Sequence, residues 1–347
     1  MTAAPGSTAR VLVVQSGFLG DVVLTTPLVT ALRRRFPEAE LAMLVTPAAA
    51  PLLAGRTALD RVEVDDKHGA GRGLAGLAAL ARRLAARRYT LAIAAHKSWR
   101  TGLALRAAGI PRRIGFAEAP AAALYTDRVP RPLGLHDRDR MLALLDPLGG
   151  AAGDRRPWVA PSAAAEAQAA ALLGPLAAAG RPLAGICPGS MWRTKRWPAH
   201  AYGALVRRLE EAGWRCVLLG APGERALTAA VRAAAGGQGL DLAGATDVGV
   251  LAALLARMAV VVTNDSAPMH VATAVGVPQV AVFCATVPAQ GYGPLGERAL
   301  VVEKDLACRP CGRHGGTRCP RGTDDCMELV EVAEVEAAIA RVRARAA

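Results

Sequence analysis

The most constraining feature of this chain is an alternation of short apolar runs with longer segments whose apolar residues recur at helical spacing. Residues 10–15 (RVLVVQ) have the composition of a buried strand, residues 21–37 are typical of a helix, and residues 41–45 (LAMLV) indicate a second strand. The same order recurs over residues 61–96. Strands and helices that alternate in this way form parallel sheets with helices on both faces. The sequence therefore predicts an α/β protein.

A second alternation follows a Pro- and Gly-rich stretch at residues 147–163. Its expected strands lie at residues 181–189, 214–221, 240–244, 259–265 and 277–284. The length of 347 residues suits two domains of roughly 150 residues each. We expect two Rossmann-like, doubly wound domains, residues 1–157 and 158–347, facing each other across a cleft where ligands bind. The last helix, residues 329–346, has a polar face and suits packing on either domain, including back on the first.

Charge and composition narrow the possible partners. The chain has 42 Lys and Arg against 29 Asp and Glu, a net charge of +13 that attracts phosphates, anionic sugars or an acidic membrane surface. Aromatic residues make up only 4%, which disfavours base stacking, so we expect no nucleic-acid partner. The first ten residues (MTAAPGSTAR) lead directly into a strand and do not resemble a signal peptide, and every long apolar window is interrupted by polar residues. We expect a cytoplasmic protein that touches a membrane only from outside the bilayer.

The first expected domain carries acidic and basic candidates just after its strands. Asp21, in the stretch SGFLGDV, lies in or before the first turn of a helix, where the helix dipole is expected to keep its carboxylate ionised near neutral pH. A helix cap would explain it equally well, and the functional alternative is a general base facing the cleft. The stretches HKSWRTG and PRRIGF supply cations that suit an anionic acceptor, or that simply face solvent: Lys97, Arg100, Arg112 and Arg113.

The second expected domain has two polar stretches at strand ends. Residues 187–200 (CPGSMWRTKRWPAH) offer hydroxyls from Ser190 and Thr194 and a cation from Lys195, which would neutralise a diphosphate unless it is a solvated surface lysine. Residues 260–270 (VVVTNDSAPMH) contain more polar groups than a helix cap needs. We expect the backbone amides from Ser266 to Met269 to form an anion cradle. The candidates in this stretch are Asn264, Asp265, Ser266, Ala267, Met269 and His270.

His270 would lie one turn into the following helix, within reach of the same cleft. Taken alone, it is equally typical of a partly buried histidine whose polar atoms are satisfied by the protein.

The seven cysteines fall into two groups. Three stand beside apolar residues and are expected to be small buried hydrophobes: Cys187, Cys216 and Cys284. Four are clustered in CRPCGRHGGTRCPRGTDDC: Cys308, Cys311, Cys319 and Cys326. The cluster has the CxxC pair of a tetrahedral zinc site, but its second pair is separated by six residues rather than two to four. Structural zinc, free thiols and a redox-dependent staple all stay open, and no catalytic metal is indicated.

These stretches together resemble glycosyltransferase family 9, the bacterial ADP-heptose:lipopolysaccharide heptosyltransferases. The resemblance is carried by residues 10–45, 112–116, 186–224 and 241–283 and by the cysteine stretch, and the motif order is closer to heptosyltransferase II than to heptosyltransferase I. It implies a GT-B fold whose first domain binds mainly the acceptor and whose second binds mainly the nucleotide sugar. It also implies inverting, metal-independent transfer of heptose from ADP-L-glycero-β-D-manno-heptose to the inner core of lipopolysaccharide. The acceptor would be a lipid A–Kdo core at the inner face of the cytoplasmic membrane.

The resemblance implies a role for each matched residue. Asp21 would be the general base, and Lys195 would lie on the ADP phosphates with Ser190 nearby. Asp265 and the loop to His270 would hold the donor, and Glu224 in GAPGE would approach the nucleoside. Two departures from the family pattern are Ala267 and Cys284, each in place of a usual glycine. The methyl of Ala267 brings the backbone less close to a phosphate and is expected to affect donor preference rather than the reaction.

Other classes of protein fit less well. A dehydrogenase would need the GxGxxG fingerprint, which SGFLG lacks, and an acidic residue about 20 positions later. A sugar-nucleotide epimerase of GT-B architecture, or a GT-B transferase with another nucleotide sugar or acceptor, is a closer alternative. A non-catalytic binder of membrane surfaces or nucleic acid is favoured only by the net charge.

Overall fold

The computed structural model describes residues 9–345 with the exception of residues 56–57, 152 and 178–179. The chain divides into two compact units, residues 1–160 and 161–347, each built around its own sheet. Both sheets are six-stranded and every strand pairing in them is parallel, which confirms the predicted α/β class.

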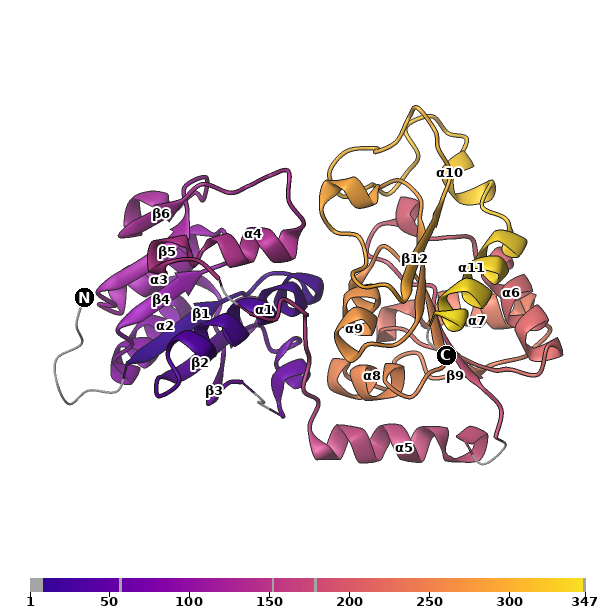
Figure 1. The fold of residues 1–347 in the computed structure, drawn as a ribbon, viewed down its shortest axis with the longest axis horizontal. Helices are drawn as coiled ribbons and strands as arrows, with labels where there is room; N and C mark the ends of the chain where they lie inside the picture. Colours follow the sequence, from indigo (N-terminus) through magenta and orange to yellow (C-terminus); the bar gives the residue numbers. More distant parts are fainter. Residues whose placement is uncertain (1–8, 56–57, 152, 178–179, 346–347) are drawn as a thin grey trace. The chain divides into compact units, whose positions relative to one another are not determined.

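The first unit is a doubly wound sheet in the order β3-β2-β1-β4-β5-β6 (Figure 1). Its strands are β1 (Arg10–Val14), β2 (Glu40–Val45), β3 (Arg61–Val64), β4 (Leu91–Ala94), β5 (Arg112–Phe116) and β6 (Asp127–Val129). Its helices are α1 (Leu19–Arg35), α2 (Gly73–Arg87), α3 (Trp99–Ala107) and α4 (Asp137–Ala143), with 3-10 turns at Ala50–Leu53, Ala122–Leu124 and Asp146–Leu148. The central strands β1 and β4 are almost entirely buried, as expected for aliphatic strands covered on both faces.

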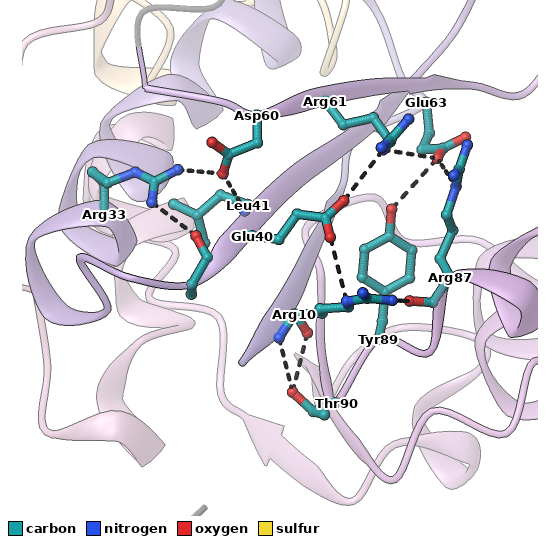
Figure 2. A network of polar contacts seen from close by, with 11 residues as sticks. Arg10, Arg33, Glu40, Leu41, Asp60, Arg61, Glu63, Arg87, Tyr89 and Thr90 are labelled. Carbon is teal, nitrogen blue, oxygen red and sulfur yellow. Dashed lines mark hydrogen bonds and ion pairs between the residues drawn. The ribbon is translucent and has the colours of Figure 1, made fainter. Parts of the chain in front are cut away.

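The amino edge of this sheet is closed by ion pairs (Figure 2). Glu40, at the start of β2, lies 3.3 Å from both Arg10 and Arg61. Glu63 in β3 accepts a hydrogen bond of 3.0 Å from Arg87. Several of the basic residues of the first unit therefore neutralise carboxylates at the amino edge, and the carboxyl edge is left to the polar loops described below.

The second unit has the strand order β12-β11-β10-β7-β8-β9. Its strands are β7 (Leu183–Cys187), β8 (Arg215–Leu218), β9 (Leu240–Asp241), β10 (Val260–Asn264), β11 (Gln279–Phe283) and β12 (Ala299–Glu303). Its helices are α5 (Ala163–Ala177), α6 (Ala199–Glu211), α7 (Arg225–Ala234), α8 (Val248–Leu255), α9 (Ala267–Val275), α10 (Asp325–Glu328) and α11 (Val332–Ala344). Three 3-10 turns lie at Arg193–Lys195, Pro222–Glu224 and Pro288–Gln290.

Helix α11, near the end of the chain, packs on the second unit. It contacts strands β11 and β12 and helix α6, and Figure 1 shows it beside β12 and α6. Val335, Ile339 and Val342 recur at helical spacing and are buried in the core of this unit. This apolar stripe decides between the two packing positions that the sequence left open.

None of the helices in the described ranges is long and apolar enough to cross a lipid bilayer. Residues 1–8, on which the expected absence of a signal peptide depends, lie outside the described part of the chain.

Candidate functional site

In the first unit, the candidate site lies at the point where the strand order reverses, between β1 and β4. Val14 and Ala94, the last residues of these strands, are partners in the parallel ladder, and the amide of His96 donates to the carbonyl of Val14 at 3.0 Å. The loops that follow the two strands therefore run side by side. The crevice between such loops is where open α/β sheets usually bind ligands.

Asp21 projects from the first turn of α1 into this crevice. A methyl group on Gly17 would lie 3.0 Å from Oδ2 of Asp21 and 3.3 Å from Cδ2 of His96, so both side chains flank Gly17 closely. The amide of Phe18 hydrogen-bonds the Asp21 carboxylate. Because Gly17 has no side chain, the carboxyl and the imidazole can both lie against it.

Burial and, to a smaller extent, the negative charge of Asp137 raise the pKa of Asp21 from 3.8 to about 7. The Phe18 amide and the positive charges of Arg131 and Lys97 act in the opposite direction and do not compensate. The expectation that the helix dipole keeps Asp21 fully ionised near neutral pH is therefore wrong. Loss of hydration outweighs the field of the helix terminus, and the carboxyl is about half protonated at pH 7.

A buried cluster of charges that the sequence analysis missed lies close enough to Asp21 to shift its pKa. Asp137, the first residue of α4, forms an ion pair with Arg131 and lies 3.5 Å from Arg140. All three side chains are almost completely buried, and Arg131 also lies over the ring of Phe116 at 5.6 Å. The signal in the sequence was the alternation HDRDR at residues 136–140 immediately at a helix start.

His96 is a further residue that the sequence analysis did not single out. Burial and the nearby Lys67 lower the pKa of His96 to about 4, so the ring is neutral at physiological pH. Its Nδ1 lies 3.1 Å from the hydroxyl of Ser16, and Lys67 donates from Nζ to the Ser16 carbonyl at 2.6 Å. The crevice therefore combines a half-ionised carboxyl, a neutral imidazole and a lysine ammonium.

The four basic candidates of the first unit separate into two groups. Lys97 lies close enough to Asp21 to lower its pKa, and Arg100 pairs with Asp65 through two hydrogen bonds of 2.8 Å. Arg112 and Arg113 begin strand β5, so they lie at the amino edge of the sheet, opposite Asp21. Arg112 pairs with Asp127 at 3.0 Å, and Arg113 donates to the Leu124 carbonyl at 2.8 Å. The structure does not bring these two arginines together with Asp21, because strand direction places them at the wrong end.

The second unit repeats this arrangement at its own reversal of strand order. Strands β7 and β10 are neighbours, and Cys187 and Thr263 near their carboxyl ends are ladder partners. The loop that carries Ser190 to Lys195 therefore runs beside the loop that leads from Asn264 into α9. The candidates of this unit gather at one place, where a diphosphate would meet both loops.

Lys195 and Asp265 form the charged centre of this place. Lys195 Nζ lies 2.6 Å from Oδ2 of Asp265, and the hydroxyl of Thr286 donates to the same oxygen at 2.6 Å. The side chains are only 13% and 8% exposed, so the alternative of a freely solvated surface lysine is excluded. Lysine has three donors, and the bond to Asp265 leaves two of them for a ligand.

Two predicted donor-binding residues brace the loops instead. The side chain of Asn264 is fully buried: it donates to the Pro188 carbonyl at 2.7 Å and accepts from the Trp197 amide at 3.0 Å and the Tyr202 hydroxyl at 3.1 Å. Thr194 is 2% exposed, and its hydroxyl is bonded to the backbone of Gly316. Their polar atoms are occupied by the protein, so they position the site rather than face a ligand. Ser190, also buried, accepts from Arg196 Nε through its carbonyl at 2.8 Å.

The anion cradle at the start of α9 is smaller than expected. Pro268 has no amide hydrogen, and the amide of Met269 donates to the Ser266 carbonyl at 3.1 Å. Within the described part of the chain, the amides left available to an anion are those of the N-cap residue Ser266 and of Ala267, the first residue of α9. Ala267 begins the helix and its methyl group needs no special backbone conformation there.

Met269 and His270 are both buried in the protein. Met269 packs with Ala281 and Phe283, and His270 is 6% exposed.

Glu224 lies beside the same loops. Its Oε2 accepts from the amide of Ala221 at 2.8 Å, and its carboxylate covers the Cα of Gly189. It therefore joins the loop after β7 to the loop after β8.

The four clustered cysteines are free thiols in the structure. Cys326 is buried in the core of the second unit, whereas Cys308, Cys311 and Cys319 are partly exposed on the preceding loop. Among the described residues, no three His, Cys, Asp or Glu side chains are arranged to hold a metal ion. The four thiols nevertheless lie close enough for Cys308, Cys311 and Cys319 to add to the effect of burial, which raises the pKa of Cys326, and structural zinc stays a prediction. Cys187, Cys216 and Cys284 are buried, as small hydrophobic side chains are.

Two parallel α/β units, each with polar loops at its reversal of strand order, define the GT-B class, and solved structures share this fold. A family 9 glycosyltransferase from Veillonella parvula matches with a TM-score of 0.87 and 23% identity, covering 99% of this chain and 100% of that one. ADP-heptose lps heptosyltransferase II of Escherichia coli matches with a TM-score of 0.79 and 22% identity, covering 97% and 99% of the two chains. At these identities the likeness concerns the fold alone.

The sequence comparison assigns the chain to a family within this fold class. Residues 77–318 match the model of glycosyltransferase family 9 (heptosyltransferase), and the chain belongs to this family. It is 25% identical over 311 residues to lipopolysaccharide heptosyltransferase 2 of Escherichia coli K12, covering 84% of this chain and 87% of the relative. The resemblance noted from the motifs is confirmed, and the protein is a glycosyltransferase.

Proposed function

We propose that this glycosyltransferase moves heptose from ADP-L-glycero-β-D-manno-heptose to the inner core of lipopolysaccharide, with inversion at the anomeric carbon. The names of the relatives support the sugar, the nucleotide and the acceptor. The observation that carries the mechanism is Asp21, a carboxyl with a pKa of about 7 in the crevice of the first unit. A strongly shifted acid at such a place is typical of a catalytic base.

The acceptor hydroxyl loses its proton to Asp21 as it attacks the anomeric carbon. A base with a pKa near 7 is ionised in a large fraction of molecules and is still basic enough to take the proton. The new bond forms between the acceptor oxygen and the anomeric carbon, on the face opposite the breaking bond to the ADP oxygen. One displacement inverts the configuration, and no covalent enzyme intermediate is needed.

The second unit would stabilise the departing ADP. Lys195 keeps two donors free beside its bond to Asp265, and the amides of Ser266 and Ala267 point out of the start of α9. A cation and a helix N-terminus stabilise the negative charge that grows on the diphosphate as the bond breaks. These groups supply the positive charge themselves, so the proposed reaction requires no metal ion.

The charge distribution supports an anionic acceptor on the first unit. Residues 1–160 hold 23 of the 42 Lys and Arg but only 13 of the 29 Asp and Glu. Much of the excess positive charge therefore belongs to the unit that contains Asp21. A phosphate-bearing lipid acceptor at the cytoplasmic face of the membrane would be attracted to it, which suits a cytoplasmic, peripheral enzyme.

The proposal is tested with purified protein, ADP-heptose and lipopolysaccharide core that lacks heptose. We expect ADP release to depend on the acceptor and the acceptor to gain the mass of one heptose. UDP-glucose as donor should give neither result. Consumption of ADP-heptose at the same rate without acceptor would contradict transfer and would indicate an epimerase or a hydrolase.

A further inference from the structure

The cysteine-rich segment, defined here as residues 308–326, is attached to the loop that carries Lys195. It leaves strand β12 and returns across the carboxyl edge of the second sheet. The amide of Cys311 donates to the Ala285 carbonyl at 2.8 Å, and the amide of Ala285 donates to the Thr194 carbonyl at 3.1 Å. Arg193 binds Asp324 through two contacts of 2.9 Å and donates to the Thr317 carbonyl at 2.9 Å. The segment is therefore fixed to the loop at several points.

The strongest attachment is between Thr194 and Gly316. The amide and the hydroxyl of Thr194 both donate to the Gly316 carbonyl at 3.1 Å, and the amide of Gly316 donates back to the Thr194 hydroxyl at 2.8 Å. These three bonds are formed at a side chain that is 2% exposed, where water competes little. Thr194 directly precedes Lys195, so the bonds fix the backbone at the base of the lysine.

The turn at residues 313–316 also contacts the lysine side chain. A methyl group on Gly315 would lie 2.9 Å from Oγ1 of Thr194 and 3.3 Å from Cγ of Lys195. His314 is close enough to Lys195 and Asp265 for both charges to act on it, and burial together with Arg313 and Lys195 lowers its pKa. The turn thus packs along the stem of Lys195 while Asp265 holds its ammonium group.

We propose that the turn at residues 313–316 is a positioning element for Lys195, through which the cysteine-rich segment sets the affinity for the donor diphosphate. A lysine side chain loses considerable rotamer freedom when it binds a ligand, and a wall that restricts its stem beforehand reduces that loss. The identity of the ligand as an ADP-sugar rests on the proposed function. The positioning role itself applies to any diphosphate bound by Lys195.

The test compares two glycine substitutions in the same segment. Gly315 and Gly322 both have φ of +74°, so Gly315→Ala and Gly322→Ala introduce the same backbone strain. Nothing lies within 4 Å of the added methyl at Gly322, whereas the methyl at Gly315 meets Thr194 and Lys195. We expect Gly315→Ala to weaken ADP binding by about tenfold in titration calorimetry and to raise the KM for donor more than it lowers kcat. Gly322→Ala should bind ADP as the wild type does.

A second pair of variants tests the attachment at Thr194. Thr194→Val removes the hydroxyl at nearly constant shape and should weaken ADP binding. Thr194→Ser keeps the hydroxyl and should bind ADP about as well as the wild type. Thermal unfolding identifies variants that lose affinity only because they unfold. Equal ADP affinity in folded Gly315→Ala and Gly322→Ala, or equal losses in both, would overturn the positioning role. Wild-type protein that binds no ADP would instead contradict the proposed donor, and the same comparison would then be made with inorganic pyrophosphate.

Discussion

Asp21 shows how two local effects compete at one residue. A carboxylate in the first turn of a helix is stabilised by the helix dipole, which supports ionisation. In this protein the crevice removes water from the same carboxyl, and Asp137 adds a negative charge beside it. Desolvation is the larger effect, and it leaves a pKa of about 7. The sequence reveals the helix terminus but not the depth of burial, so it predicts the residue and misses its protonation state.

Neutralising Asp137 should move the pH dependence of transfer. Asp137→Asn removes a negative charge that raises the pKa of Asp21, while Arg131 and Lys97, which lower it, remain. The proposed mechanism requires ionised Asp21, so kcat/KM should rise with pH through the pKa of Asp21, and this rise should occur at lower pH in the variant. Asp139→Asn, on the same helix and paired with Arg138, is the control and should leave the profile in place. An unchanged profile in folded Asp137→Asn would contradict the influence of Asp137.

Asp21→Asn should stabilise the fold at alkaline pH. The pKa of Asp21 is about 7 in the folded protein against an ordinary value of 3.8, so the unfolded chain releases this proton first as the pH rises. The wild type therefore loses stability from about pH 4 to about pH 7, and the variant avoids this loss. Denaturant unfolding should show a larger gain for the variant at about pH 8 than at about pH 5. The same gain at both pH values would show that Asp21 is not abnormally protonated.

Strand direction explains which polar stretches could be placed at the carboxyl edges of the sheets from the sequence. The polar stretches after β1, β4, β7 and β10 were predicted because each follows an apolar run, and the parallel ladders bring them together in pairs. Arg112 and Arg113 precede the apolar part of their strand and therefore lie at the opposite edge. A rule that separates residues before a strand from residues after it would have excluded them.

Tertiary contacts decided the role of the polar side chains inside these loops. Asn264 and Thr194 stand in motifs that suit a ligand, but their partners are 67 and 122 residues away in the sequence, at Trp197 and Gly316. No local pattern identifies such partners. The sequence therefore predicted which loops come together at the candidate site, and the structure was needed to separate the residues that hold these loops from the residues that can face a ligand.

The hydrogen bonds of Asn264, at the end of β10, should contribute measurably to the free energy of unfolding. Asn264→Ala leaves the buried Trp197 amide and Tyr202 hydroxyl without their acceptor, which should lower the free energy of unfolding by about 2–4 kcal/mol. Tyr202→Phe removes one of these bonds and should cost about 1 kcal/mol. Urea unfolding of the two variants checks this order. A loss in Asn264→Ala no larger than in Tyr202→Phe would show that Asn264 does not hold the loops.

For the whole molecule, alternating strands and helices were enough to predict two doubly wound α/β units, because each segment needs a partner to cover its apolar face. The structure confirms the α/β class and the parallel sheets. The cysteine spacing leaves the role of the four thiols open, and Cys326 lies in the hydrophobic core. What a cysteine faces depends on the packing of distant elements, so spacing alone does not establish a metal site.

Loss of the Lys195 charge should affect donor binding and turnover together. In the proposed mechanism, Lys195→Ala removes a cation that contacts the diphosphate both in the bound donor and in the departing ADP, so kcat/KM should fall by roughly 10²–10³-fold. Lys304→Ala, which breaks the pair between Lys304 and Glu334 in the same unit, is the control and should be near wild type. Steady-state kinetics with varied donor, together with ADP titration, measures both effects. Normal turnover in Lys195→Ala would remove this lysine from the mechanism.

Asp21→Asn tests most directly the proposal that the first unit supplies the general base and the second unit binds the donor. The measurement is the rate of heptose transfer together with the affinity for ADP-heptose in the same folded variant. The account predicts that transfer falls by about 10²–10⁴-fold, the usual contribution of a general base, while the dissociation constant of ADP-heptose stays near that of the wild type. Near-normal transfer by Asp21→Asn would contradict the central claim that this buried carboxyl accepts the proton of the attacking hydroxyl.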